Sequence, residues 1–419
     1  MMFSQTVNRQ ILVLKVNVFY LFCFGRAACC IGTMTFAGAL PVLRNEWHMD
    51  ASSAGSLQTI LNISNALALF AASWLSDWYG PRRIYLVFSW LGSIALLLFG
   101  VFAHSYISAA LLMAFIGMTQ GGAYTPAIMV AMQMHSAAKR GYAVGMILAG
   151  GSLGYLLSLF ISSWGASTWG AATAFYLCAG CVFVGSVTSS LALKKGSDWV
   201  FPSNPAHQKN EGGNNKWNSV ALLLLLGYIA HCWELLGSWT WTPSLIYTAL
   251  IPYQTSPVIN SMLIAAVIHL SGMFSTLIIG TLSDYFNRTT VLIVMGGLGG
   301  LCSLLTGWSL TWGIGWVLLC AFMGNFFILG DSGVLSAAIA DNVAPKALGK
   351  TMGIRSLLGF GIGSFSPLSF GVVMDMTGKW HMAYCVLAAG GGVAFLAALI
   401  IKILSCQKLM TVFSSDHRI

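Results

Sequence analysis

The sequence predicts an all-α integral membrane protein with twelve transmembrane helices in two six-helix pseudo-repeats. Three observations predict this fold class: an apolar composition, regularly spaced apolar segments of membrane-spanning length, and a short motif that recurs in the second half. Of the 419 residues, 57% are hydrophobic and only 7% are charged, whereas a soluble domain carries about 25% charged residues. So few charges cannot cover a water-soluble surface, and lipid must cover much of it.

The apolar segments fit a bilayer, whose hydrocarbon core of about 30 Å needs about 20 helical residues. Charges, prolines and polar clusters delimit twelve of them, at 16–41, 54–75, 84–103, 107–133, 141–163, 170–193, 218–242, 259–281, 290–309, 313–340, 351–373 and 380–404. The one long polar interruption predicts a cytosolic linker at 194–217. It separates an N-terminal bundle (1–193) from a C-terminal bundle with a short cytosolic tail (218–419).

The positive charges predict that both termini lie in the cytosol. In that orientation only Arg44 and Lys379 fall outside, and Arg26 and Arg355 fall within spans. The other sixteen basic residues are cytosolic: Arg9, Lys15, Arg82, Arg83, Lys139, Arg140, Lys194, Lys195, Lys209, Lys216, Arg288, Lys346, Lys350, Lys402, Lys408 and Arg418. The net charge of +9 therefore reflects membrane topology, not a nucleic-acid-binding patch. We expect a monomer in the cell inner membrane.

The ten cysteines do not indicate a cofactor or metal site. The Cys178-x-x-Cys181 pair lies inside an apolar segment, and no second pair follows at metal-ligand spacing. We expect all ten to be small buried apolar side chains, with no metal and no cofactor.

An internal repeat relates the two halves. Leu-Ser-Asp followed by an aromatic residue occurs at Asp77 and again at Asp284, 207 positions later. A second match, at an offset of 208, pairs the glycine-containing helix that begins near Gly141 with the one that begins near Gly349. Two matches at nearly one offset indicate duplication.

The loop after the second predicted helix resembles the signature loop of the major facilitator superfamily. Its residues here are Asp77, Gly80, Arg82 and Arg83, with a degenerate copy at Asp284 and Arg288. Ser73 replaces the family's opening glycine and Trp78 its arginine. The resemblance implies secondary transport by alternating access, with the substrate site between the repeats near the membrane midplane.

The loop carboxylates are candidate gating residues. A carboxylate at a helix N-terminus contributes about 0.3–2 kcal/mol. By repeat symmetry we expect Asp77 to cap the eleventh helix near Gly349, and Asp284 to cap the fifth near Gly141. Alternatively, Arg82 and Arg83 serve only as positive anchors at the membrane face.

Burying an ionisable side chain at the centre of a span costs at least about 2.5–3.5 kcal/mol, so each such residue is a candidate for a functional or structural role. Arg26, near the middle of the first span, is the candidate ligand for an anionic group because guanidinium is a permanent, forked donor. A structural pair with a carboxylate is the alternative.

Two carboxylates and a histidine are candidates for proton coupling. Glu234 follows His231 by three residues, so both lie on one helix face, and burial favours the protonated form of a carboxylic acid. Asp331 lies in the flexible Gly330–Gly333 stretch. Three structural alternatives remain open: permanent pairing of Glu234, a structural role for His231, and a salt bridge between Asp331 and Arg355. Without that salt bridge, Arg355 is a gating candidate or extends to the cytosolic interface.

Uncharged polar and aromatic residues complete the candidate substrate site: Gln120, Tyr124, Tyr155, Trp233 and Asn325. Each is also suited to interhelical packing. The leading hypothesis is proton- or ion-coupled transport of a small anionic or zwitterionic solute. A broad-specificity proton-antiport exporter of lipophilic compounds and a non-transporting sensor or assembly protein are the alternatives. The sequence contains no clustered nucleophile and no phosphate-binding loop, so we do not expect an enzyme.

Overall fold

The computed structural model describes residues 18–135, 140–194, 219–343 and 348–416. Twelve helices within these ranges are long and apolar enough to cross a membrane, and each coincides with a predicted segment. The predicted fold class is confirmed. The first span, Val18–Glu46, is longer than expected, as is the seventh, Ser219–Tyr253.

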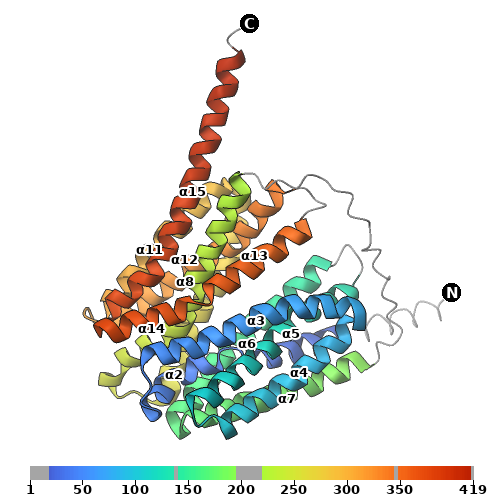
Figure 1. Cartoon of the computed structure of the whole chain (residues 1–419), viewed down its shortest axis with the longest axis vertical. Coiled ribbons are helices and arrows are strands. Elements are labelled where there is room, and N and C mark those ends of the chain that lie inside the picture. Colours follow the sequence, from blue (N-terminus) through green and yellow to red (C-terminus); the bar gives the residue numbers. More distant parts are fainter. Residues whose placement is uncertain (1–17, 136–139, 195–218, 344–347, 417–419) are drawn as a thin grey trace, which may run out of the picture. The chain divides into compact units, whose positions relative to one another are not determined.

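The colours of Figure 1 follow the helices in chain order. After a helical segment at 18–30 they are α2 (Thr35–Glu46), α3 (Ala51–Tyr79), α4 (Pro81–Phe102), α5 (Tyr106–Gln133), α6 (Arg140–Trp169), α7 (Ala171–Lys194), α8 (Ser219–Leu250), η3 (Ile251–Tyr253), α9 (Pro257–Ala265), η4 (Ala266–Leu270), α10 (Ser271–Tyr285), α11 (Arg288–Ser309), α12 (Ile314–Asn342), α13 (Leu348–Gly363), α14 (Ser366–Thr377) and α15 (Trp380–Asp416).

The chain forms two compact units. The first comprises Met1–Glu46 and Ile63–Glu211, and the second comprises Trp47–Asn62 and Gly212–Ile419. The division after Glu211 lies inside the segment that the sequence predicts to be a linker. Helix α3 is shared, because its first three turns belong to the second unit and the rest to the first.

Large apolar side chains cover the outer faces of both units. Phe70 and Leu111 in the first unit are 67% and 69% exposed, and Phe274 and Leu396 in the second are about half exposed. Such side chains are favourable against hydrocarbon and unfavourable against water. The exposed surface is therefore that of a multi-pass membrane protein.

The first span, in the first unit, contains a break. The helix is interrupted by a turn at residues 31–34 before α2 continues it. Side chains of neighbouring helices satisfy the backbone groups at the break: Gln120 Nε2 donates to the Gly32 carbonyl at 3.0 Å, and the Met34 N–H donates to Ser158 Oγ at 2.9 Å. Irregular backbone at membrane depth is tolerated only where protein groups satisfy it in this way.

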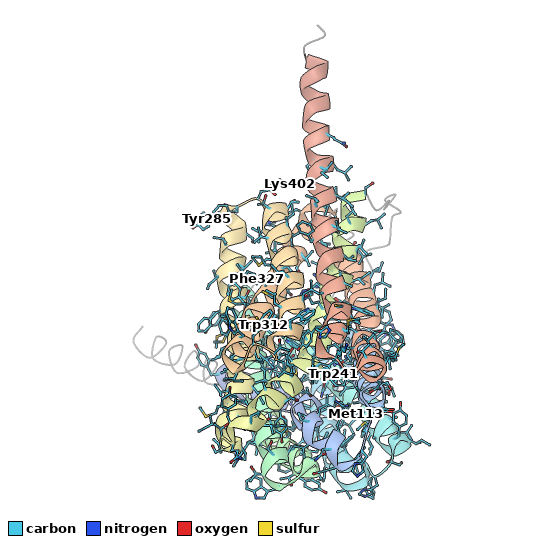
Figure 2. All side chains as sticks on the ribbon, turned by 90° about the vertical axis from the view of Figure 1, so that its left-hand side faces the viewer. Met113, Trp241, Tyr285, Trp312, Phe327 and Lys402 are labelled. Atoms are coloured by element: carbon cyan, nitrogen blue, oxygen red, sulfur yellow. The ribbon has the colours of Figure 1, made fainter. Side chains whose placement is uncertain are left out.

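Close glycine contacts hold the second unit together. Helices α11 and α15 approach so closely that a Cβ atom on Gly391 would lie 2.5 Å from the backbone of Gly300, and one on Gly296 would lie 2.9 Å from the Phe395 nitrogen. Small residues at such crossings allow backbones to approach within van der Waals contact. In Figure 2, Tyr285 and Lys402 lie at one end of this unit and Trp241 lies toward the other.

The first turns of α3 dock on α14 within the second unit. Both oxygens of Asp375 accept hydrogen bonds from the start of α3, one from the Ala51 N–H at 2.8 Å and one from the Ser52 N–H at 2.7 Å. Side chains larger than hydrogen at Gly55 or Gly371 would overlap the facing backbone. The carboxylate satisfies two N–H groups that a helix start leaves free.

Candidate functional site

Arg26 lies on the first span, one turn before its break, and is only 6% exposed. Two close approaches bury it. Helix α7 packs against the preceding residue, because a Cβ atom on Gly185 would lie 2.8 Å from the Gly25 carbonyl oxygen. Helix α6 packs against the following residue, where Gly154 faces the Ala27 carbonyl.

Tyrosines surround the Arg26 guanidinium. Its carbon lies 5.9 Å from the centre of the Tyr124 ring on α5, a cation–π distance. The Tyr155 hydroxyl on α6 and the Tyr85 hydroxyl on α4 are close enough to interact with its charge. Tyr85 is fully buried and bonds to Ser189 Oγ at 2.9 Å. Three of the predicted residues, Arg26, Tyr124 and Tyr155, therefore lie together.

No carboxylate compensates Arg26 in the described part of the first unit. Ion pairs among the described residues join His231 to Asp331 and Arg288 to Asp341, all in the second unit. The carboxylates described in the first unit are Glu46, which accepts a hydrogen bond from the Ala171 N–H at 3.0 Å, and Asp77, which is exposed at the end of α3. The structural pair that the sequence left open for Arg26 is absent from the described residues.

Gln120 belongs to the same region, because its amide contacts the carbonyl of Gly32 beside the break. Ser158 on α6 contacts the other side of the break. Neither Ser158 nor the break is apparent from the sequence pattern. Gly32 and Thr33 could have indicated the break, but they lie within one continuous apolar stretch of membrane-spanning length.

Glu234 lies in the interior of the second unit, 3% exposed. Ser303 Oγ on α11 donates a hydrogen bond of 2.5 Å to its Oε1. Its other oxygen faces α15, where a Cβ atom on Gly391 would lie 2.9 Å away. Two glycine-rich helices thus form a fitted recess for this carboxyl group. Within the described residues no cation pairs with it.

His231 pairs with Asp331 across α8 and α12. The His231 Nδ1 and Asp331 Oδ1 atoms lie 2.6 Å apart, and both side chains are almost fully buried. The two atoms are in close contact without the alignment of a hydrogen bond. Asp331 therefore pairs with His231 and not with Arg355, the partner that the sequence suggested. Asp331 is also near enough to Glu234 for their charges to interact.

Arg355 on α13 lies flat on an aromatic ring. Its guanidinium carbon is 3.9 Å from the centre of the Tyr228 ring, and its Nη1 donates to Ser336 Oγ at 2.6 Å. The Tyr228 ring in turn stacks on His231 at 5.8 Å. The Arg355 guanidinium is thus held by the Tyr228 ring and the Ser336 hydroxyl group. The same ring contacts His231, which pairs with Asp331.

Two other predicted residues contact the interior of the second unit. Trp233 Nε1 donates to the Val386 carbonyl on α15 at 2.8 Å, so this ring lies against a neighbouring helix. Asn325 is 1% exposed, and its Nδ2 donates to the Ala321 carbonyl one turn earlier. Its Oδ1 has no hydrogen-bond partner among the described residues, which leaves an acceptor available to a bound solute.

The loop motif residues lie at helix ends. Gly80 precedes α4 with φ +81°, a backbone conformation that favours glycine. Asp77, Arg82 and Arg83 form no ion pair among the described residues, whereas Arg288 pairs with Asp341 at the end of α12 at 2.7 Å. The side chain of Asp284 lies outside the described residues. The expected caps at Gly349 and Gly141 stay predictions.

The contact between Asp375 and the start of α3, which the sequence did not indicate, can be tested by mutation. We expect Asp375→Asn to open the docked start of α3 about two- to fivefold more often, because a charge at a helix N-terminus contributes about 0.3–1 kcal/mol at an exposed site. The measurement is the labelling rate of Ala51→Cys, whose parent residue is fully buried, in a chain without its native cysteines.

Asp50→Asn is the matched control. Asp50 Oδ1 accepts from the Ser53 N–H at 2.8 Å within α3, and asparagine retains that local cap. Equal labelling rates in wild type and Asp375→Asn would show that the Asp375 contact does not hold α3.

Comparison with known proteins identifies relatives over most of the chain. A family model described as Major Facilitator Superfamily matches residues 22–336. A probable sulfoacetate transporter, SauU, of Cupriavidus necator is 24% identical over 414 residues, which cover 93% of each chain. A probable 4-methylmuconolactone transporter of Cupriavidus pinatubonensis is 24% identical over 353 residues, which cover 78% of each.

Solved structures share the fold. A mutant of the nucleoside transporter NupG superposes with a TM-score of 0.73 at 13% identity, covering 92% of this chain and 99% of that one. A bacterial homolog of the human lysosomal transporter Spinster gives 0.69 at 16% identity, covering 93% and 96%.

Proposed function

Because the chain belongs to the major facilitator superfamily and is a membrane transporter, not an enzyme, we propose that it carries a small organic anion across the membrane, coupled to protons. We propose that it works by alternating access in the cell inner membrane, as a monomer with both termini in the cytosol. Arg26 is the proposed ligand of the anionic group, and Glu234 the proposed coupling carboxylate.

One observation carries the choice of an anion: Arg26 is a buried cation with no carboxylate partner among the described residues. A guanidinium at membrane depth costs several kcal/mol unless a negative charge compensates it. An anionic substrate would supply that charge. The cost of burying Arg26 would then be recovered only when the substrate is bound.

The relatives support the same substrate class. Sulfoacetate and 4-methylmuconolactone are small organic acids, and both are anions at neutral pH. The tyrosines beside Arg26 suit such a solute, because their hydroxyl groups donate to oxygen atoms while their rings cover its carbon skeleton. The alternative, a broad-specificity exporter of lipophilic compounds, has less support, because the Arg26 cation costs energy to bury and would repel the cationic members of that class.

The second unit supplies a separate candidate for the coupling proton. Glu234 is buried in its recess, accepts one hydrogen bond, and has no paired cation among the described residues. A carboxyl group at membrane depth without a paired cation is costly, so its presence requires a functional explanation. Proton coupling is the explanation that we propose.

A ligand screen tests the proposal. Purified protein would be heated with sulfoacetate, 4-methylmuconolactone, other carboxylates, amino acids and lipophilic amines, at two pH values. We expect at least one organic anion, and no lipophilic amine, to raise the unfolding temperature, because a ligand that binds only the folded state stabilises it. Stabilisation by amines or neutral compounds alone would overturn the assignment of an anion.

A further inference from the structure

The break in the first span leaves donor groups unpaired at the start of α2. The first intrahelical hydrogen bond of α2 joins the Gly38 N–H to the Met34 carbonyl at 3.0 Å. The N–H groups of Thr35, Phe36 and Ala37 have no hydrogen-bond partner among the described residues, and all three residues are buried. Because buried N–H groups are nearly always paired, these three require an acceptor that the described part of the chain does not supply.

The unpaired N–H groups of α2 point toward the break. In an α-helix each N–H is directed toward the N-terminus, so the first turn presents its free donors there, together with about half a positive charge from the helix dipole. Helix α2 has 12 residues, which is long enough for this dipole to develop. A helix N-terminus of this kind is suited to carboxylate, sulfate and phosphate groups.

Arg26 approaches the same break from the other side. It lies one turn before Cys30, the last residue of the helical segment 18–30, and the Cys30 thiol is close enough to interact with its charge. The guanidinium therefore extends toward the break. Arg26 is 6% exposed and forms no ion pair or hydrogen bond among the described residues. Two sets of unpaired donors, one from a side chain and one from the backbone, thus flank the break.

Two tyrosines lie at the same level of the first unit. Tyr124 follows Gln120, which contacts one side of the break, by one turn of α5. Tyr155 precedes Ser158, which contacts the other side, by one turn of α6, and its hydroxyl group interacts with the Arg26 charge. Their hydroxyl groups add donors beside the break.

We propose that the anionic head of the substrate binds in the break, between the Arg26 guanidinium and the N–H groups of Thr35, Phe36 and Ala37. The proposal rests on the proposed function and extends it, because it assigns half of the anion site to the backbone of α2. Donors on two sides require an acceptor with at least two terminal oxygen atoms, so the head is a carboxylate or a sulfonate. Its charge compensates Arg26 and the α2 dipole together.

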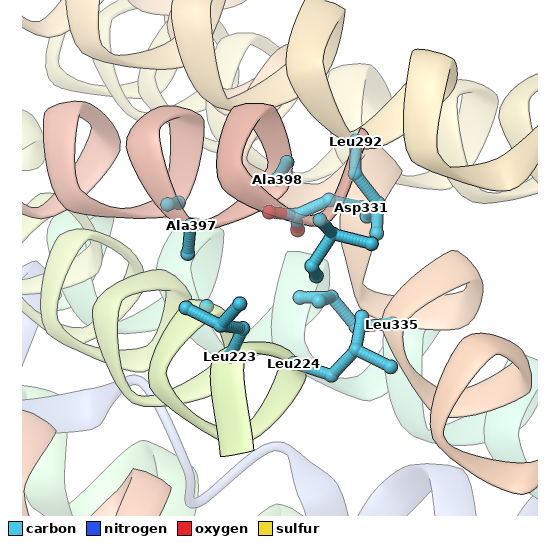
Figure 3. A pocket seen from close by; sticks show the side chains of 10 residues that line it. Leu223, Leu224, Leu292, Asp331, Leu335, Ala397 and Ala398 are labelled. Atoms are coloured by element: carbon cyan, nitrogen blue, oxygen red, sulfur yellow. The ribbon is translucent and has the colours of Figure 1, made fainter. Parts of the chain in front are cut away.

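A small pocket in the second unit does not suit the same group. Apolar residues and glycine line it, and Asp331 is its one charged residue among those described. Figure 3 shows the Asp331 carboxylate among the side chains of Leu292, Leu335 and Ala398. A carboxylate in apolar surroundings repels an anion, so we assign the anionic head to the break and not to this pocket.

Removing one N–H group from the first turn of α2 tests the proposal. Ala37→lactic acid replaces the amide by an ester, which deletes the N–H and keeps the methyl side chain. The probe is sulfoacetate, titrated calorimetrically into the purified full-length protein, with ethanesulfonate and propionate as analogues that carry a single head. We expect the affinity to fall about tenfold, because the lost hydrogen bond is one to a charged group. A loss confined to ethanesulfonate or to propionate identifies the head as sulfonate or carboxylate.

Ala39→lactic acid is the matched control, because the Ala39 N–H belongs to the regular part of the same helix. It is expected to leave the affinity within about twofold, since that N–H is not free to bind a ligand. Ala37→Pro also lacks the N–H, is tolerated in a first helical turn, and replaces the ester should that variant fail to fold.

Unchanged affinity in a folded Ala37 variant, or an equal loss in the Ala37 and Ala39 variants, would overturn the backbone site and leave the proposed function intact. Failure of every organic anion to bind the wild-type protein would overturn both. The two failures are therefore distinguishable.

Discussion

Arg26→Gln is expected to abolish binding and transport of the organic anion. Removing one partner of a buried charge pair costs about 2–5 kcal/mol, which is about 30-fold to several thousandfold in affinity. The measurement is isothermal titration of the anion that the ligand screen identifies, followed by counterflow in proteoliposomes. Wild-type affinity in a folded Arg26→Gln variant would remove Arg26 from the site.

The same substitution is expected to leave the ligand-free protein at least as stable as wild type. Arg26 has no ion-pair partner among the described residues, so glutamine removes a desolvated charge and orphans no carboxylate. A structural arginine would behave oppositely, because its loss would lower the unfolding temperature. Thermal unfolding without ligand therefore separates the two roles of Arg26.

Two further variants define what Arg26 provides. Arg26→Lys keeps the charge but loses the forked donor geometry, so we expect affinity between those of wild type and Arg26→Gln. Arg44→Gln removes a cation from the end of the same span, where α2 terminates. It is expected to leave affinity within about twofold, because a charge near water is screened.

Glu234→Gln is expected to uncouple transport from protons. Glutamine keeps the size of the side chain and an oxygen that accepts from Ser303, but it cannot release a proton. We expect accumulation driven by a pH gradient to fall to passive equilibration. Exchange of labelled for unlabelled anion should stay within about twofold, because exchange moves no net proton and the Arg26 surroundings are unaltered.

Proteoliposomes with the same anion on both sides, with and without a pH gradient, give both rates. Glu46→Gln is the control, because Glu46 is a carboxylate outside the recess that contacts the Ala171 N–H at the start of α7. Uphill accumulation in Glu234→Gln would show that another group carries the proton. Loss of exchange as well would assign Glu234 a structural role.

The candidate residues differ in how far sequence could place them. His231 and Glu234 lie three residues apart, and helical periodicity correctly puts them on one face of α8. Periodicity does not reveal which helices face them. In the structure His231 meets Asp331 on α12, whereas Glu234 enters the recess formed by Ser303 and Gly391 on two other helices.

Arg355 shows the same limit. The sequence left open a salt bridge with Asp331, since both are ionisable residues on consecutive predicted helices. Packing instead placed the guanidinium on the Tyr228 ring and left Asp331 to His231. Stacking satisfies a planar cation without a carboxylate, and sequence spacing contains no information about that choice.

The membrane class, the twelve spans and the family could be predicted from sequence, because hydrocarbon imposes length and hydropathy on every segment that crosses it. The ionisable residues inside spans could be selected in the same way, because burying charge in a span is costly. Four features became visible only in the folded chain: the break beside Arg26, the pairing of Asp331 with His231, the recess of Glu234 and the docking of α3 through Asp375. These features depend on contacts between helices distant along the chain, and those contacts follow from side-chain shape and glycine placement at helix crossings.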